Sequence, residues 1–224
     1  MPQGMANVER DGFPLVPGVL SVEQIDELLA SLGPVNRAGR RGMLAVPAVL
    51  ELAQSVRVLE LVRPHLPAEP RPVRAIFFNK TAETNWLVAW HQDLTLALRE
   101  RIEVPGFGPW SVKDGIPHVQ PPVELLQQML TVRLHLDGAD EANGALRVVP
   151  GSHRQGRLSQ QQIESLRGQQ PEQHCTAAAG DALLMRPLLL HASSRSTSAR
   201  PRRILHLEYA SFALPDGLAW HEGA

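Results

Sequence analysis

Histidine followed two positions later by an acidic residue occurs three times in this chain: His91 with Asp93, His135 with Asp137, and His206 with Glu208. On a β-strand, side chains two positions apart point to the same face, so each pair could offer an imidazole and a carboxylate to one metal ion. Nine histidines and 23 acidic residues in 224 positions give roughly one such pair by chance. A single pair is therefore weak evidence for a metal site.

The surroundings of the three pairs differ. Asp137 opens the turn-forming segment DGADEANG, where an Asp side chain commonly bonds to its own backbone, so a turn role is expected. His206 and Glu208 lie inside a run of alternating polarity and could be a mutually satisfied pair instead of ligands. His91 and Asp93 follow the apolar run WLVAW and precede a long polar segment, which predicts a position at an open end of the fold.

A metal site of two histidines and one carboxylate needs a third ligand from a distant strand, with the opposite face open for substrate and oxygen. His191 suits this role at the end of the run LLMRPLLLH, although it could simply close a buried strand. Arg202 follows at the start of the next predicted strand, where a guanidinium could hold a carboxylate in bidentate fashion. Arg203 competes for this role, but the spacing and the strand alternation favour Arg202.

Helices are predicted mainly in the N-terminal part. Ser21 and Gln24 have the spacing of a capping box, apolar residues follow at helical spacing, and Gly33-Pro34 ends the helix. A second helix is predicted from Pro47 to about Leu61, because its apolar residues form one stripe. A short polar helix is expected at residues 159–168.

After Pro72 the pattern changes to short apolar or alternating runs separated by turn sequences. The predicted strands cover residues 73–78, 86–90, 129–136, 145–149, 182–185, 188–191 and 203–212. These runs predict a mainly β fold, a sandwich or double-stranded β-helix (jelly roll), with the N-terminal helices packed on one sheet. We expect a single domain over residues 1–224, with a helical part at 1–72 and a jelly-roll core at 73–213.

Residues 99–122 form an insertion rich in Pro and Gly, which predicts a long lid-like loop. Trp110 and Lys113 in this insertion are candidate substrate contacts, although a loop tryptophan can also be a packing anchor. The insertion is where we expect the substrate to be selected.

Outside the insertion, three more residues are candidates for contact with the substrate. Lys80 ends an earlier predicted strand and could meet an anionic substrate, although a surface lysine is an equally good interpretation. Gln92 would point away from its two neighbours on an ideal strand, but strand twist could bring it to the site. Arg133 lies on a polar face of its predicted strand, and this face could line the interior or point outwards.

Composition limits the partners. The net charge of -1 provides no field that would attract nucleic acid or an anionic membrane. The longest apolar stretch, residues 182–190, is too short to span a bilayer. Because there is one cysteine, Cys175, and no secretory signal pattern at the N-terminus, we expect a cytoplasmic protein without an intrachain disulfide. A monomer or homodimer acting on a small molecule is expected.

Several segments together are more specific than any one pair: DGFPLVPGVLSVEQIDELLASL, WHQD, NGALRVVPGSHRQGRL, GDALLMRPLLLHASS and PRRILHLEY. In these segments the chain resembles the phytanoyl-CoA dioxygenase family of Fe(II)- and 2-oxoglutarate-dependent oxygenases, over nearly its whole length. The resemblance implies that His91, Asp93 and His191 are the iron ligands. It also implies that Arg202 and Ser193 hold the distal carboxylate of 2-oxoglutarate.

The resemblance implies a reaction as well. Fe(II), 2-oxoglutarate and O2 would be needed, and succinate and carbon dioxide would be released as a substrate C–H bond is oxidised. Asp93 argues for hydroxylation or a related oxidation, because halogenating relatives have a small residue in place of this carboxylate. We therefore expect hydroxylation of an unactivated C–H bond in a small organic molecule. The alternatives are a non-catalytic jelly-roll binding protein and a cupin-like metalloenzyme that does not use 2-oxoglutarate.

Overall fold

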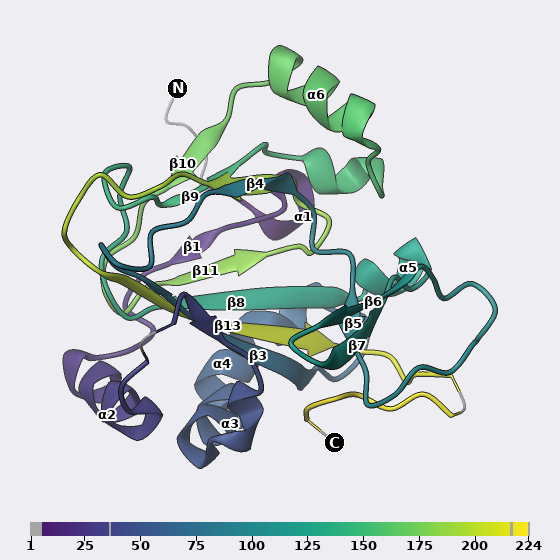
Figure 1. The fold of residues 1–224 in the computed structure, drawn as a ribbon, viewed down its shortest axis with the longest axis horizontal. Helices are drawn as coiled ribbons and strands as arrows, with labels where there is room; N and C mark the ends of the chain where they lie inside the picture. Colours follow the sequence, from purple (N-terminus) through teal and green to yellow (C-terminus); the bar gives the residue numbers. More distant parts are fainter. Residues whose placement is uncertain (1–5, 36, 216, 224) are drawn as a thin grey trace.

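The chain folds into antiparallel sheets with helices on the outside (Figure 1). The computed structural model describes residues 6–35, 37–215 and 217–223. The helices are α1 (Val8–Asp11), α2 (Val22–Leu32), α3 (Pro47–Gln54), α4 (Val56–Val62), α5 (Val123–Leu126) and α6 (Gln160–Gln169), with short 3-10 turns η1 (Met43–Ala45), η2 (Arg63–His65) and η3 (Ser152–Gln155). The strands are β1 (Leu15–Val16), β2 (Gly39–Arg40), β3 (Arg71–Lys80), β4 (Val88–His91), β5 (Leu96–Ala97), β6 (Trp110–Lys113), β7 (Ile116–Val119), β8 (Met129–His135), β9 (Leu146–Val148), β10 (Gln173–Cys175), β11 (Ala182–Met185), β12 (His191–Ser193) and β13 (Arg202–Ala210).

Two facing sheets form the centre of the molecule (Figure 1). The large sheet has the strand order β1-β11-β8-β13-β3-β2, and the small sheet has the order β10-β9-β12-β4. This arrangement confirms the expected mainly β jelly roll. Within the described ranges the two sheets stay separate and do not close into a barrel. Strands β1 and β2 belong to the N-terminal part of the chain and join the large sheet.

Helices α3 and α4 cover the outer face of the large sheet, as the sequence predicted (Figure 1). The alternation along β3 separates the two faces of the large sheet. Ala75 and Phe77 pack in the core with Val49 and Val58 of these helices. The alternate residues of β3 point to the opposite face. The capping box of α2 is present, with the Ser21 hydroxyl accepting a hydrogen bond from the Gln24 amide.

The helix predicted from Pro47 to about Leu61 is divided in two at Ser55. This residue is extended, with φ -62° and ψ 144°, and its hydroxyl accepts a hydrogen bond from the Val58 amide. A serine at this position therefore acts as an N-cap for a new helix, which the apolar stripe alone did not indicate.

The insertion at residues 99–122 is not the long loop that was expected. Strands β6 and β7 form a hairpin, and β7 also pairs with β5 to make a third sheet. At the turn, Asp114 and Gly115 both have positive φ, 52° and 79°. Asp-Gly is a strong signal for such a two-residue hairpin turn, so the sequence contained the information. Phe107 and Val119 anchor the insertion in a small apolar core.

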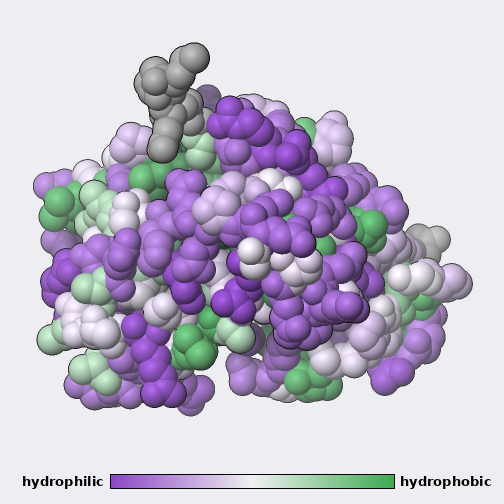
Figure 2. All heavy atoms as spheres, turned by 90° about the horizontal axis from the view of Figure 1, so that it is seen from above, coloured by the Kyte–Doolittle hydropathy of each residue, from purple (hydrophilic) through white to green (hydrophobic). Residues whose placement is uncertain are grey.

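No helix in the described part of the chain is long and apolar enough to cross a membrane. The face shown in Figure 2 is mostly hydrophilic, and its hydrophobic residues form small, separate groups.

Candidate active site

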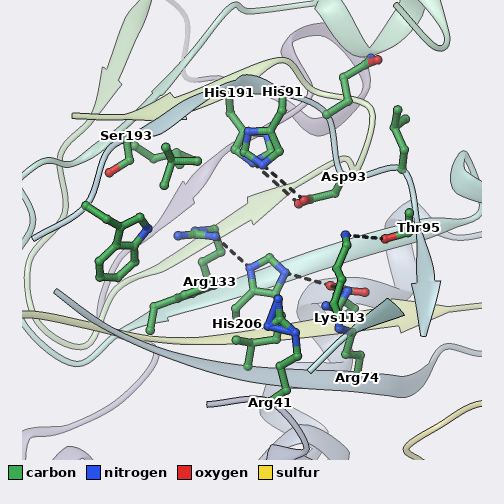
Figure 3. Close-up of a pocket in the computed structure, with 18 of the residues that line it drawn as sticks. Arg41, Arg74, His91, Asp93, Thr95, Lys113, Arg133, His191, Ser193 and His206 are labelled. Carbon is green, nitrogen blue, oxygen red and sulfur yellow. Dashed lines mark hydrogen bonds and ion pairs between the residues drawn. The ribbon is translucent and has the colours of Figure 1, made fainter. Parts of the chain in front are cut away.

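Strands β4 and β12 bring His91, Asp93 and His191 together. The two strands pair so that His191 lies opposite His91. Nε2 of His91 is 3.7 Å from Oδ1 of Asp93, and Nε2 of His191 is 3.7 Å from Oδ2 of the same carboxylate. Within the described residues, this is the group whose possible ligand atoms all lie within 4.8 Å of one another. We call these three residues the ligand triad (Figure 3).

His191 begins a strand, whereas the sequence suggested that it ends one. The preceding segment contains Pro187, which has no N–H to contribute to a ladder, and the chain turns before Leu190. The Pro187 carbonyl accepts a hydrogen bond from the Asp93 amide at 2.9 Å, so this turn also fixes the backbone of Asp93.

Hydrogen bonds fix the orientation of both histidine rings. Nδ1 of His91 lies 2.9 Å from the Ala89 carbonyl, and Nδ1 of His191 lies 2.8 Å from the Leu189 carbonyl. A carbonyl can only accept, so each Nδ1 carries the proton and each Nε2 is left with a free lone pair.

The charges of the ligand triad suit a divalent metal. Burial lowers the pKa of His191 to about 4, which keeps this imidazole neutral at neutral pH. Burial raises the pKa of Asp93, but His191 and His91 lower it, and the result lies below the ordinary value. Two imidazole nitrogens beside a carboxylate on one side of an open cavity form a donor set that fits Fe(II).

A cluster of cations lies beside Ser193. Lys80 Nζ donates to the Ser193 hydroxyl at 2.9 Å and to the Ser194 carbonyl at 2.6 Å, and Arg202 Nη2 donates to the same hydroxyl at 3.2 Å. Burial, together with repulsion by Arg202 and Arg133, lowers the pKa of Lys80 to about 7. Among the described residues, no acidic side chain forms an ion pair with these three cations, so the pocket fits an anionic ligand.

Backbone packing beside this cluster requires a glycine. Gly144 has φ +75°, and a Cβ added there would collide with the Ser194 carbonyl and lie 3.2 Å from Lys80 Nζ. The Asn143-Gly144 sequence forms a turn. Because Gly144 has no side chain, the chain can also pass close to Lys80 at this point.

Arg202 and Arg203 point in opposite directions from β13. Arg202 lines the cavity, whereas Arg203 binds both carboxylate oxygens of Asp137, at 2.8 and 2.7 Å. Asp137 also accepts a hydrogen bond from the Arg203 amide, so it joins two strands instead of bonding to its own turn. This geometry favours Arg202 over Arg203 as a cavity residue.

The ligand triad opens into a cavity of about 470 Å³. A chain of buried polar contacts crosses its floor (Figure 3): His206 Nδ1 lies 2.9 Å from Arg133, His206 Nε2 lies 3.2 Å from Glu208, and Glu208 lies 3.1 Å from Arg74. His206 and Glu208 are therefore a satisfied pair that lines the cavity, as one interpretation of the sequence proposed.

The other candidate residues lie in different environments, and only some of them line the cavity. Arg133 and Lys113 line the cavity, and Lys80 lies behind Ser193. Gln92 also borders the cavity, but its amide is fully engaged with backbone groups at Gly156, Leu158 and Leu188. Trp110 is not among the residues that line the cavity and packs in the small apolar core instead.

Some residues around the cavity were not singled out from the sequence. Arg74, Ile76 and Phe78 share the inner face of β3, and the two-residue period of that strand would have revealed them. Arg41 follows a two-residue strand, and no local pattern marks it.

Residues 8–204 match the sequence profile of the family described as phytanoyl-CoA dioxygenase (PhyH). The chain belongs to this family. PhyH proteins are Fe(II)- and 2-oxoglutarate-dependent oxygenases, so the enzyme class and cofactors expected from the sequence are confirmed. No curated protein sequence matches the chain.

Solved structures agree with this PhyH assignment at the level of the fold. AviO1 from Streptomyces viridochromogenes Tue57 is 21% identical, with a TM-score of 0.67 over 93% of each chain. HygX from Streptomyces hygroscopicus, with nickel and 2-oxoglutarate bound, is 19% identical, with a TM-score of 0.64 over 91% of this chain and 84% of that one. SnoN, an alpha-ketoglutarate-dependent epimerase from nogalamycin biosynthesis, is 18% identical, with a TM-score of 0.65 over 91% of this chain and 78% of that one.

Proposed function

We propose that this PhyH-family enzyme hydroxylates an unactivated C–H bond of a small organic molecule. The overall reaction consumes the substrate, O2 and 2-oxoglutarate and yields the alcohol, succinate and carbon dioxide. The observation that carries the proposal is that the ligand triad and the cation cluster around Arg202 border one cavity. Bound Fe(II) with 2-oxoglutarate would supply the oxidising chemistry that no side chain can provide.

In this proposal one set of side chains binds the metal and another binds 2-oxoglutarate. Nε2 of His91, a carboxylate oxygen of Asp93 and Nε2 of His191 would bind the metal from one side. Arg202, Ser193 and Lys80 would bind the distal carboxylate of 2-oxoglutarate, and this anion would relieve the repulsion among the buried cations. In this proposal Lys80, first considered as a substrate contact, binds the cosubstrate instead.

Two features bear on the outcome of the reaction. Asp93 occupies the position where halogenating relatives have a small residue, which supports oxygen transfer over halogenation. SnoN is an epimerase, so relatives with this fold are not limited to hydroxylation. Product analysis by mass spectrometry would show a gain of one oxygen atom for hydroxylation and no change of mass for epimerisation.

Anaerobic addition of Fe(II) and 2-oxoglutarate tests the residue assignments. We expect the weak visible charge-transfer band of the iron chelate in the wild type. His91→Ala should lose iron, whereas Arg202→Ala should keep iron and bind 2-oxoglutarate about 10- to 100-fold more weakly, because a charged hydrogen-bond donor is removed.

Arg203→Ala is the matched control, since it removes the neighbouring guanidinium from the opposite face of β13. It should bind 2-oxoglutarate as the wild type does. A wild-type protein that binds iron but gives no band would indicate a metalloenzyme that does not use 2-oxoglutarate. A protein that binds neither would indicate a non-catalytic jelly roll.

A further inference from the structure

A second group of positive charges lines the cavity, away from Ser193. Arg41, Arg74 and Lys113 form this group. In Figure 3, Ser193 lies to the left of the ligand triad, and Lys113 and Arg74 lie to the right and below. Lys113 belongs to β6 in the insertion, whereas Arg41 directly follows β2. Segments far apart in the sequence therefore supply these charges to one place.

The distance along β3 separates this group from the proposed 2-oxoglutarate site. Lys80 and Arg74 lie on the same face of the strand, six positions apart. At roughly 3.3 Å per residue, their Cα atoms are about 20 Å apart. A five-carbon dicarboxylate bound at Lys80 cannot span that distance. The second group of charges is therefore available for a different ligand.

The acidic residues near this group leave positive charge uncompensated. Glu208 already binds Arg74 and His206. Asp114 lies 3.4 Å from Arg41, but its side chain is 74% exposed, so water screens the pair. Glu208 attracts both Arg41 and Lys113 from a distance, but among the described residues neither cation has a buried acidic group within 4.0 Å.

Two polar atoms beside the cavity have donor capacity that the described residues leave unused. Arg41 Nε is buried and has no hydrogen-bond partner among the described residues. Lys113 Nζ donates to the Thr95 hydroxyl at 3.3 Å, and within the described ranges it has no acidic group within 4.0 Å. An anion between these side chains would accept hydrogen bonds from both and offset their charges.

The cavity wall between the two charged ends has an apolar part beside the polar floor formed by Arg133 and His206. Ile76 and Phe78 on β3, together with Leu94 just after the ligand triad's Asp93, contribute to it. A ligand held by its acidic group at the Arg41 end would place its carbon skeleton over these side chains. The cavity of about 470 Å³ must also hold 2-oxoglutarate, which favours a compact ligand.

We propose that the substrate is a small organic acid whose anionic group binds between Arg41 and Lys113, with its apolar skeleton against Ile76, Phe78 and Leu94. This inference rests on the proposed function, because it concerns the substrate of the same site. A carboxylate and a phosphate monoester share the chemistry that these cations recognise.

The test uses compact aliphatic and aromatic probes in three matched forms: the carboxylic acid, its methyl ester, and the phosphate monoester of the corresponding alcohol. Binding is measured anaerobically on the Fe(II)- and 2-oxoglutarate-loaded protein, by calorimetry and by the change in the charge-transfer band. We expect an acid or a phosphate to bind and the neutral ester to bind at least about 10-fold more weakly. The comparison of acid with phosphate identifies the preferred anion.

Variants show whether the proposed residues are responsible. Lys113→Gln and Arg41→Gln should each weaken acid binding by about 10- to 100-fold and leave 2-oxoglutarate binding unchanged. Arg101→Gln is the matched control, because it removes a charge from the same insertion at an exposed ion pair with Glu103. If Arg41→Gln does not fold, Lys113, which is exposed, carries the test.

The inference is overturned if ester and acid bind equally, if no probe in either anionic form binds, or if both variants bind the acid as the wild type does. Each of these results counts against the inference only when the wild-type protein shows the charge-transfer band. Absence of that band contradicts the proposed function itself, and the inference with it.

Discussion

At the residue scale, the proposed 2-oxoglutarate site would make cosubstrate binding depend on pH through Lys80. Its pKa in the protein without an anion is about 7, because of burial and of repulsion from Arg202 and Arg133. Binding of the 2-oxoglutarate carboxylate favours the charged amine. At pH values below 7 the amine is already protonated, whereas above 7 a proton must be taken up on binding.

We therefore predict that the affinity for 2-oxoglutarate is nearly constant below pH 7 and falls by about 10-fold per pH unit above it. Calorimetric titration of the nickel-loaded protein over this pH range measures the slope. Lys80→Met should bind more weakly and lose the pH dependence. An unchanged slope in Lys80→Met would show that another group is responsible.

At the scale of elements, Gln92 connects β4 to two segments that do not pair with it. Its Nε2 donates to the Gly156 and Leu188 carbonyls at 2.8 and 2.7 Å, and its Oε1 accepts from the Leu158 amide at 2.8 Å. Because Gln92 lies between two residues of the ligand triad, these bonds hold both in position. Gln92, directly after this short strand, is thus a positioning residue.

Gln92→Ala should lower the free energy of unfolding by about 2–4 kcal/mol, because two buried backbone groups and one half-buried carbonyl lose their partner. It should also weaken metal binding by about 10- to 100-fold. Chemical denaturation and metal titration measure the two effects. Gln160→Ala is the control, since it removes an exposed glutamine that bonds to Glu164 on α6. Equal metal affinity in Gln92→Ala and wild type would contradict a positioning role.

At the scale of the whole molecule, the helical N-terminal part and the sheets share one core. The Tyr209 hydroxyl, on β13, donates to the Ala53 carbonyl of α3 at 2.9 Å, and the Tyr209 side chain is fully buried. The core of the large sheet includes apolar residues of α2, α3 and α4. Two parts that share a core in this way cannot unfold independently without exposing it.

We predict a single cooperative unfolding transition. The four tryptophans, Trp86, Trp90, Trp110 and Trp220, all lie outside residues 1–72, so their fluorescence reports on the sheets. Far-UV circular dichroism reports largely on the helices. The two transitions should coincide, and Tyr209→Phe should shift both by about 1 kcal/mol. Separate transitions would contradict the single-domain structure.

Local patterns accounted for the elements that depend on neighbouring residues. The capping box at Ser21, the alternation in β8 and β13 and the polar helix α6 could be predicted because each depends on periodicity or capping within a few residues. The break at Ser55 and the hairpin at Asp114-Gly115 were missed although their signals were present.

What the sequence by itself determined is the metal chemistry. The His91-Asp93 pair, His191, Ser193 and Arg202 could be selected because residue type, strand alternation and a family resemblance agreed on them. These are constraints that spacing along the chain can express, since side chains at alternate positions of a strand must share a face.

Only the tertiary structure decided which charges surround the cavity. Arg41, Arg74 and Lys113 come from three separate segments and meet because β2, β3 and the β6–β7 hairpin border one space. Arg202 and Arg203 are adjacent and chemically alike, and the fold places one beside Ser193 and the other on Asp137. Contacts between distant segments depend on packing, and no local pattern encodes them.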